Sequence, residues 1–404
     1  KKFNKFLSVA VASAMVMAMA GCGNTDNGSA ATGTNAATES AAASDSAASG
    51  SVFKIGGIGP TTGGAAVYGL AVQHGAEIAV EEINAAGGIN GYQVEFKFQD
   101  DEADAEKSVN AYNALKDWGA QIIDGSTTSG ACIAVTDKTK EDNMFQITPS
   151  GSAVECVQYD NNFRVCFSDP NQGLASAQYI GENGLAEKIA VIYDSSDVYS
   201  SGIYEKFAKE AENQPFEIVA AEAFTADNKT DFSVQLQKAK DAGADMVFLP
   251  IYYQESALIL TQAAAMGYAP KWFSCDGMDG ILGGVDNFDV SLTEGVMLLT
   301  PFAADATDDL TQSFVTKYKE KYGETPNQFA ADSYDAIYVI KAAIEKSGVT
   351  PDMSVSDICD GMKAAMTEIT VDGLTGNGMT WTADGEANKA PKAVVIENGA
   401  YKAM

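Results

Sequence analysis

Short apolar runs alternate with amphipathic segments along most of this chain, and this alternation constrains the fold more than any other feature. Runs such as Lys188 to Asp194 (KIAVIYD) and Ala244 to Tyr252 (ADMVFLPIY) are nearly all apolar, as in strands buried on both faces. Segments between such runs, for example Asp231 to Gly243, have helical periodicity. This order predicts right-handed βαβ crossovers and parallel sheets. The 404 residues are enough for two such domains.

The same alternation gives approximate positions for the elements. We expect strands at 52–58, 92–100, 120–124, 144–148, 161–167, 188–194, 216–224, 244–252 and 271–277. We expect helices at 71–84, 103–118, 132–141, 172–183, 200–213, 231–243, 255–267, 310–322 and 329–347. A β-rich tail should end the chain, with GMTWTADGE (378–386) and KAVVIENGAYK (392–402).

Two loops rich in hydroxyl side chains lie between 124 and 155, each after a short apolar run. The first loop carries Ser126, Thr127, Thr128 and Ser129, and the second carries Thr148, Ser150 and Ser152. In an open α/β sheet, ligands collect at the carboxyl ends of the strands. Hydroxyls and free N–H groups at a helix start can hold an anion such as a carboxylate. Serine and threonine are also ordinary helix caps and turn residues, so a purely structural role stays open.

The first 22 residues, KKFNKFLSVAVASAMVMAMAGC, predict a secretory signal peptide, since lysines precede an apolar run and small residues follow it. The apolar run is short for a membrane span. The ending Met-Ala-Gly-Cys resembles a bacterial lipobox, with Cys22 as the lipid-bearing first residue of the mature protein; a plain signal with an unrelated cysteine is the alternative. Residues 23–51, rich in Ala, Ser and Thr, predict a flexible linker. We therefore expect an extracytoplasmic protein, lipid-anchored to the bacterial cell membrane.

Charge and motif content exclude several functions. The net charge of −29 disfavours nucleic-acid binding. A dinucleotide-binding GxGxxG motif fails because position 62 is threonine, and no GxxxxGK[ST] motif occurs. A Ser-His-Asp triad would need the single histidine, His74, which lies inside an expected helix. We expect no catalytic residues and no cofactor. An exported hydrolase is the rival class, and the lack of further histidines counts against it.

Metal and cysteine chemistry is equally limited. With one histidine and no CxxC motif, no zinc site is expected, and the acidic run Asp100 to Asp104 should be a solvated loop, with a cation site as the open alternative. Five cysteines follow Cys22: Cys132, Cys156, Cys166, Cys275 and Cys359. Export permits disulfides. Cys132 and Cys156 flank the two hydroxyl loops and form the preferred pair, whereas Cys166 and Cys275 are expected to be buried thiols.

Five segments, in order, carry a resemblance to a known family. FKIGGIGPTTGGAAVYG, GAEIAVEEINAAGGINGYQVEFKFQDDEAD, ITPSGSA, FRVCFSDPNQG and GMTWTADGE resemble the branched-chain amino acid binding proteins of bacterial ABC importers. The resemblance covers residues 52–404. It implies an α/β fold of the type I periplasmic-binding-protein kind, with two doubly wound lobes joined by three hinge crossovers. On this template one lobe comprises 52–168 plus 300–376, and the other comprises 169–299 plus 377–404.

The resemblance also implies a ligand site for a zwitterion. Ser129 falls where the family holds the ligand carboxylate, and Ser150 and Ser152 fall in the loop that holds both the ammonium and the carboxylate. Asp276 stands where the family has an acidic partner for the ammonium; it is one methylene shorter than the family's common glutamate. A simple turn role for Asp276 stays open. With Arg164 as the single arginine, an arginine clamp on the carboxylate is nearly excluded, and Arg164 should pair with a local carboxylate.

Four aromatic residues complete the implied site. Tyr199 and Tyr252 match tyrosines that close over the amino acid from the second lobe, and Tyr68 and Phe329 would line the side-chain pocket. The expected protein is a monomeric, lipid-anchored solute-binding protein that delivers an amino acid, with an aliphatic side chain, to the membrane subunits of a permease. The alternative is the same fold binding another amide or small polar amine, or serving as the ligand-binding subunit of a sensor.

Overall fold

The computed structural model describes residues 50–404. The predicted signal peptide, the predicted lipidation site Cys22 and the linker up to residue 49 lie outside the described residues. Within residues 50–404, no helix is both long and apolar enough to cross a membrane.

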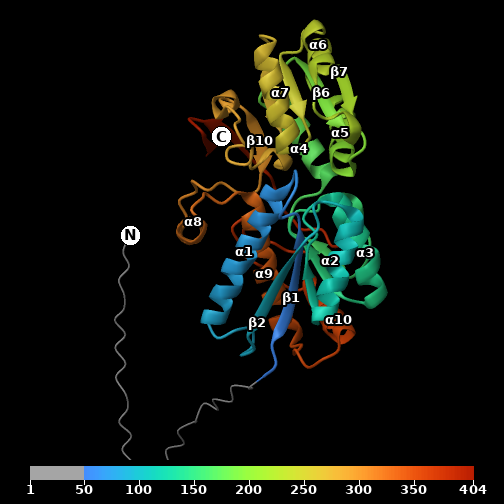
Figure 1. The fold of residues 1–404 in the computed structure, drawn as a ribbon, viewed down its shortest axis with the longest axis vertical. Coiled ribbons are helices and arrows are strands. Elements are labelled where there is room, and N and C mark those ends of the chain that lie inside the picture. The colour runs from blue at the N-terminus through green and yellow to red at the C-terminus, as the bar shows by residue number, and fades with distance from the viewer. Residues whose placement is uncertain (1–49) are drawn as a thin grey trace, which may run out of the picture. The chain divides into compact units, whose positions relative to one another are not determined.

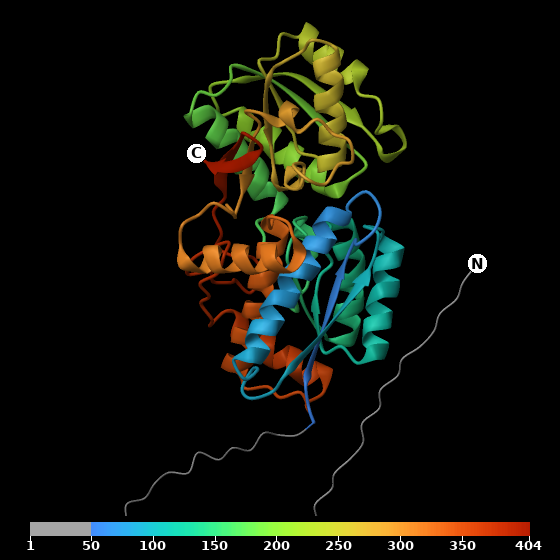
Figure 2. The ribbon, with the colours of Figure 1, turned by 60° about the vertical axis from the view of Figure 1, so that its left-hand side comes forward.

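The first sheet has five parallel strands in the order β2-β1-β3-β4-β5 (Figure 1). Its strands are β1 (Phe53–Gly59), β2 (Val94–Asp100), β3 (Ile122–Asp124), β4 (Phe145–Thr148) and β5 (Asn162–Arg164). The helices that belong with it are α1 (Ala66–Ala85), α2 (Ala105–Trp118), α3 (Ser129–Asp142), α8 (Asp309–Tyr322), α9 (Gln328–Ser347) and α10 (Val355–Met366). Although α1 and α9 are far apart in sequence, they pack side by side, and α8 also contacts α1 (Figure 2).

The second sheet has seven strands in the order β12-β11-β10-β9-β8-β6-β7. They are β6 (Lys188–Asp194), β7 (Glu217–Phe224), β8 (Met246–Leu249), β9 (Lys271–Ser274), β10 (Met297–Thr300), β11 (Lys392–Glu397) and β12 (Ala400–Ala403). The pairings are parallel from β7 through β10 and antiparallel from β10 through β12. The helices that belong with it are α4 (Asp169–Glu182), α5 (Val198–Ala211), α6 (Ser233–Asp241) and α7 (Tyr253–Ala265).

The two sheets share one topology, and this places the site. The order β7-β6-β8-β9-β10 repeats the order β2-β1-β3-β4-β5. In each sheet the order reverses beside the first strand, between β1 and β3 and between β6 and β8, and a crevice for ligands opens at the carboxyl ends of the strands there. The predicted α/β fold of two doubly wound lobes is therefore confirmed. The chain passes between the sheets after β5, returns after β10 and passes again before β11. The exact lobe limits, 52–168 plus 300–376 and 169–299 plus 377–404, stay a prediction.

Continuous apolar runs explain why the central strands form. Every residue of β4 and of β8 is buried, as a strand covered by helices on both faces requires. The helix α9 buries one broad apolar face, which includes Ile337, Ile340 and Ile344, against the first sheet and α1. The packing of such faces, rather than helix propensity alone, stabilises these helices.

The structure differs from the expected elements at the end of the chain. The strand β10 and the helix α10 were not expected. The segment 378–386, predicted as β-rich, forms only two isolated bridges, Val371 with Met379 and Trp381 with Ala387. The segment instead bonds the end of β5: the indole Nε1 of Trp381 donates to the carbonyl of Arg164 at 2.8 Å, and Gly385 O accepts from the Arg164 amide at 3.0 Å. This segment is therefore a crossing between the sheets, not a strand.

Candidate functional site

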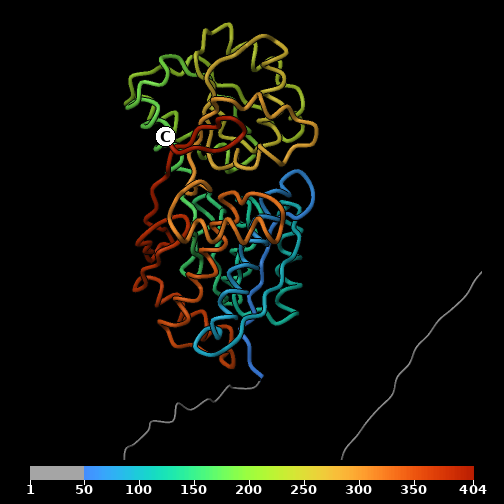
Figure 3. The backbone as a smooth tube through the Cα atoms, turned by 90° about the vertical axis from the view of Figure 1, so that its left-hand side faces the viewer, coloured from blue at the N-terminus to red at the C-terminus, as the bar shows by residue number. Residues whose placement is uncertain are grey.

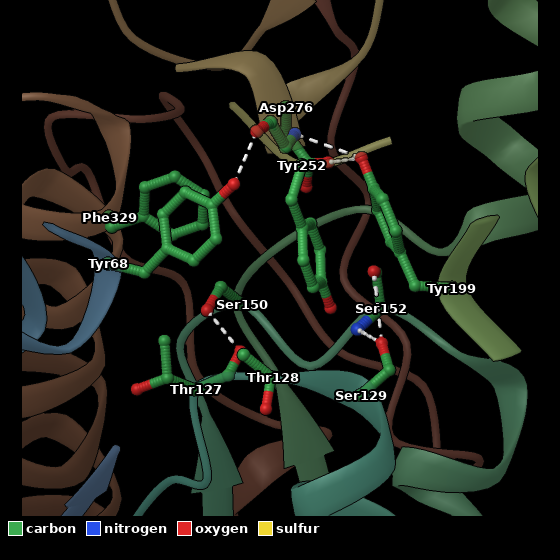
Figure 4. Close-up of a pocket in the computed structure, with 11 residues that line it drawn as sticks. Tyr68, Thr127, Thr128, Ser129, Ser150, Ser152, Tyr199, Tyr252, Asp276 and Phe329 are labelled. Atoms are coloured by element: carbon green, nitrogen blue, oxygen red, sulfur yellow. Dashed lines mark hydrogen bonds between the residues drawn. The ribbon is translucent and has the colours of Figure 1, made fainter. Parts of the chain in front are cut away.

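A pocket of about 230 Å³ lies where the carboxyl ends of the two sheets meet. Figure 4 shows its lining, with the labelled serines and threonines below, Asp276 above, Tyr68 and Phe329 on one side and Tyr199 on the other. The lining residues are Tyr68, Thr127, Thr128, Ser129, Ser150, Ser152, Tyr199, Tyr252, Asp276, Gly277 and Phe329. All eight residues predicted to bind ligand are among them, so the fold brings together side chains that lie up to 261 positions apart in sequence, from 68 to 329.

One end of the pocket is acidic. Asp276 begins the short 3-10 helix after β9 and is 4% exposed. Its Oδ1 accepts a hydrogen bond from the Tyr199 hydroxyl at 2.7 Å, and the same hydroxyl accepts from Gly277 N at 2.9 Å. Burial raises the pKa of Asp276 to about 7, with the Tyr199 hydrogen bond opposing this effect and the nearby carboxyl of Asp332 adding to it. A buried carboxyl without a cationic partner is suited to receive a ligand's ammonium group.

The opposite end of the pocket is formed by the N-terminus of α3. This helix begins at Ser129 with Thr128 as its N-cap, and the Thr128 side chain makes no capping hydrogen bond. The Thr128 hydroxyl is buried and has no hydrogen-bond partner within residues 50–404. The first amides of a helix are free donors, and the helix dipole favours negative charge there. Thr128 and the start of α3 together can therefore hold a carboxylate.

Ser129 lines the pocket and also bonds the second hydroxyl loop. Its Oγ accepts hydrogen bonds from the backbone amides of Ser152 and Ala153, each at 3.1 Å. Its hydroxyl also lies 3.4 Å from that of Ser152. Ser129 therefore lines the pocket but also ties the two hydroxyl loops together. Its ligand contact stays a prediction, as do those of Ser150 and Ser152.

The second hydroxyl loop is held by Arg164, which is fully buried. Its Nη1 donates to Ser152 O at 2.6 Å and to Gly151 O at 3.3 Å, and its Nη2 donates to Ala153 O at 2.9 Å. Its Nε lies 3.3 Å from a carboxylate oxygen of Glu386. The expected carboxylate partner exists, but it comes from the distant last crossing and not from a neighbouring stretch of sequence. Arg164 thus serves the backbone of the loop.

Aromatic rings form the walls between these two ends. Tyr68 contacts Phe329 with ring centroids 4.4 Å apart and meets Tyr252 edge-on at 5.4 Å. Tyr252 also stacks on Tyr199 at 5.0 Å. Figure 4 shows Tyr252 pointing down between the two hydroxyl loops. Such walls suit an apolar ligand side chain and also attract a cation to their ring faces.

The sequence-based site omitted Thr127, Thr128 and Gly277, all of which line the pocket. Thr128 belongs to the hydroxyl loop that the sequence analysis singled out, but the resemblance selected its neighbour Ser129. A local signal existed, because the residue immediately before a helix is its N-cap and lies next to the free amides. The helix start was expected near 132, so this signal was placed too late.

The cysteine prediction was partly wrong. In residues 50–404 the five cysteines are free thiols, so the preferred disulfide between Cys132 and Cys156 is absent. Both sulfurs are buried in one small cluster, but each has another polar neighbour: Cys132 Sγ lies 3.6 Å from Gln146 Nε2, and Cys156 Sγ lies 3.7 Å from Ser129 O. Cys166 and Cys275 are buried thiols, as expected.

The other candidate groups lie outside the pocket. The His74 ring stacks on Tyr322 at 3.7 Å, between α1 and α8. In the acidic run, Asp100 accepts from the Thr61 amide at 2.8 Å, and Asp104 caps α2. Among the described residues, no group of three or more His, Cys, Asp or Glu side chains could hold a metal ion. The acidic run thus has turn and capping roles.

Two α/β lobes with an enclosed, polar-ended pocket at their facing strand ends define a two-lobe ligand-binding protein. Residues 52–400 match the family described as periplasmic binding protein. The chain therefore belongs to the periplasmic binding protein family. Since this is a family of binding proteins, the chain is not an enzyme.

Named relatives agree with this family. The chain is 31% identical over 300 residues to a Leu/Ile/Val-binding protein homologue of Brucella melitensis, covering 74% of this chain and 80% of that protein. It is 30% identical over 302 residues to the leucine-, isoleucine-, valine-, threonine- and alanine-binding protein of Pseudomonas aeruginosa, covering 73% and 78%. Among solved structures, the branched-chain amino acid transporter substrate-binding protein LivJ of Streptococcus pneumoniae, in complex with isoleucine, matches with a TM-score of 0.79 and 29% identity, covering 87% of this chain and 98% of that one.

Proposed function

We propose that this protein is the solute-binding component of an ABC importer and captures an L-amino acid with an aliphatic, branched side chain between its lobes. The observation that carries the proposal is the pair of opposite pocket ends. The buried carboxyl of Asp276 lies at one end, and the unpaired Thr128 hydroxyl at the N-terminus of α3 lies at the other. A zwitterion needs an acidic group for its ammonium and hydrogen-bond donors for its carboxylate, and both sets of groups are desolvated when the lobes close.

The walls of the pocket support an apolar ligand side chain. Tyr68, Tyr252 and Phe329 present rings between the two polar ends. The names of the relatives support the same ligand class: one is a Leu/Ile/Val-binding protein homologue, and the other is named for binding leucine, isoleucine, valine, threonine and alanine.

Ligand-induced stabilisation tests this function. L-leucine, L-isoleucine and L-valine should each raise the unfolding temperature, since a ligand that binds only the folded state stabilises it by RT ln(1 + [L]/Kd), about 4 kcal/mol at 1,000 times Kd. The measurement is a thermal shift on the purified protein. The matched controls are 4-methylpentanoic acid, which lacks the ammonium of leucine, and 3-methylbutylamine, which lacks the carboxylate. No shift with any of the three amino acids would refute the proposal.

One observation favours a second candidate ligand class. The carboxylate end of the pocket has hydroxyls and helix amides but no cationic side chain among its lining residues. A neutral amide or a small polar amine would need only Asp276 and these donors. In that case the amine control would shift the unfolding temperature as strongly as leucine does. The same fold could then serve a sensor as its ligand-binding subunit.

We also propose that Cys22 carries a lipid and that residues 23–51 tether the lobes to the outer face of the membrane. The support is the signal-like segment that ends in Met-Ala-Gly-Cys. Cys22→Ser should move the protein from the membrane fraction to the soluble fraction, because one side chain bears the anchor. Immunoblotting of fractionated cells measures this, with Cys359→Ser as the matched control. Membrane retention of the Cys22 variant would contradict the anchor.

A further inference from the structure

The hydroxyl of Tyr68, whose ring forms a wall of the pocket, bonds the backbone of the other lobe. It donates a hydrogen bond to the carbonyl of Gly277 and accepts one from the amide of Tyr253 at 3.2 Å. Tyr68 lies near the start of α1, on the first lobe, whereas Gly277 follows β9 and Tyr253 begins α7, both on the second lobe. The Tyr68 side chain is 1% exposed. One hydroxyl thus joins the lobes through two backbone groups, and its single proton is used in the bond to Gly277.

The neighbouring residue packs across the same gap. A Cβ built at Gly280 or at Gly284 would lie 2.6 Å from a methyl carbon of Val67. Gly280 also has a φ of +107°, which favours glycine. The second lobe therefore offers bare backbone where α1 approaches it. Val67 could not approach the second lobe this closely if Gly280 and Gly284 carried side chains.

The segment that leads to Tyr68 lies away from the crossings between the lobes. Figure 3 shows the crossing segments gathered on one side of the molecule, while the blue segment between β1 and α1, just before Tyr68, lies on the other side. When lobes rotate about their crossings, contacts far from the crossings separate most. In contrast, Gln328 donates to Asp276 O at 2.9 Å and also bonds Thr300, the last residue before the second crossing. Gln328 therefore supports the Asp276 loop from the pivot side.

We propose that the Tyr68 hydroxyl is a closure latch: it holds the two lobes together around a bound ligand by bonding Gly277 and Tyr253, and it makes no ligand contact of its own. This inference rests on the proposed function for the identity of the ligand. The Tyr68 hydroxyl then controls how long a ligand stays bound and has no part in selecting which ligand binds. The ring of Tyr68 keeps its separate role as a wall of the pocket.

A latch of this kind has a kinetic signature. In the open state, water replaces both hydrogen bonds, so each neutral bond contributes only its net strength, about 1 kcal/mol, or about fivefold in rate. Tyr68→Phe keeps the ring and removes only the hydroxyl. It should speed ligand dissociation by about five- to thirtyfold and leave the association rate constant unchanged, because the lobes are apart when ligand enters. The factor should be the same for every ligand.

The experiment is stopped-flow measurement of association and dissociation for L-leucine, L-isoleucine and L-valine with the wild type and Tyr68→Phe. Tyr318→Phe is the matched control, because its hydroxyl bonds Glu324 within the first lobe and lies outside the pocket. An equal acceleration of dissociation for all three ligands supports the latch. An unchanged dissociation rate, a slower association, or a factor that varies with the ligand side chain would overturn it.

A failure of the proposed function has a different appearance. If the wild type binds none of the three amino acids, that function is wrong, and the same stopped-flow comparison is made with a ligand of the second class, an amide or small amine that raises the unfolding temperature. Faster dissociation of that ligand from Tyr68→Phe than from the wild type would support the latch. An unchanged dissociation rate would overturn it.

Discussion

Asp276→Asn is expected to weaken amino-acid binding by roughly thirtyfold to several thousandfold. The substitution keeps the size and hydrogen-bonding shape of the side chain but removes the charge that we propose pairs with the ligand's ammonium. Truncating one partner of a buried charge pair costs about 2–5 kcal/mol, much of it from the charge left unpaired, and about 1.4 kcal/mol corresponds to a tenfold change in affinity. Isothermal titration calorimetry with L-leucine measures the effect.

Asp279→Asn is the matched control. Asp279 is 4% exposed and lies three residues on, but it accepts from the Gln328 amide at 2.9 Å and does not line the pocket. Its variant should bind within about threefold of the wild type, since no ligand charge is left unpaired. Equal affinities for the wild type and Asp276→Asn would make Asp276 a turn residue and remove the ammonium site.

The same carboxyl should make binding depend on pH. Only ionised Asp276 can pair with an ammonium, and its pKa in the unliganded protein is about 7. Affinity should therefore rise as the pH increases through 7 and fall by on the order of a hundredfold from pH 8 to pH 5, with a proton released on binding at low pH. Asp332, with a pKa of about 6 and an ion pair to Lys389, and the buried Asp169 also titrate nearby. Measuring affinity against pH for both proteins separates these groups: the pH dependence that is present in the wild type and absent in Asp276→Asn is due to Asp276.

Arg164→Met should lower the free energy of unfolding by about 3–5 kcal/mol, the largest stability effect that we expect at a single position. Its guanidinium donates to the carbonyls of Gly151, Ser152 and Ala153 and pairs with Glu386 of the last crossing. Removing one partner of a buried ionic network is strongly destabilising, because buried acceptors lose their donors. Urea unfolding of the unliganded variant, followed by circular dichroism, measures the loss.

Arg164→Lys and Glu386→Gln separate the contributions. Lysine keeps the charge, but its ammonium cannot donate to several carbonyls at once as the planar guanidinium does. We therefore expect an intermediate loss of unfolding free energy. Glu386 is about one-third exposed, so its variant should cost no more than about 1 kcal/mol. An unchanged unfolding midpoint for Arg164→Met would contradict the role of Arg164 in holding the Ser150–Ser152 loop.

Much of this protein followed from its sequence alone. The alternation of apolar runs and amphipathic segments determined the α/β class, because strand and helix periods are properties of neighbouring residues. The hydroxyl loops after β3 and β4 were located because ligands gather at strand ends. Because the sequence has a single arginine, an arginine that binds the ligand carboxylate was nearly excluded. In the structure Arg164 donates to backbone carbonyls of the second hydroxyl loop and does not line the pocket. The resemblance then selected eight residues, which all line one pocket.

Other features depended on contacts that no local pattern contains. The partnership of Tyr199 with Asp276 joins loops after β6 and β9, and the bond from Tyr68 to Gly277 joins separate lobes. Segment 378–386 has strand-like composition, but Arg164 engages its backbone, so it crosses between the sheets instead.

The hydroxyl loops show the division most clearly. The sequence alone determined that hydroxyls cluster at the start of a helix, but only the tertiary structure decided which of them has a hydrogen-bond partner and which has none. Ser129 is drawn to the amides of Ser152 and Ala153, whereas the Thr128 hydroxyl is left without a partner. The physical reason is that a hydroxyl bonds whichever donor or acceptor lies nearest in space, and its neighbours across the sheet are set by the packing of distant segments and not by adjacent residues.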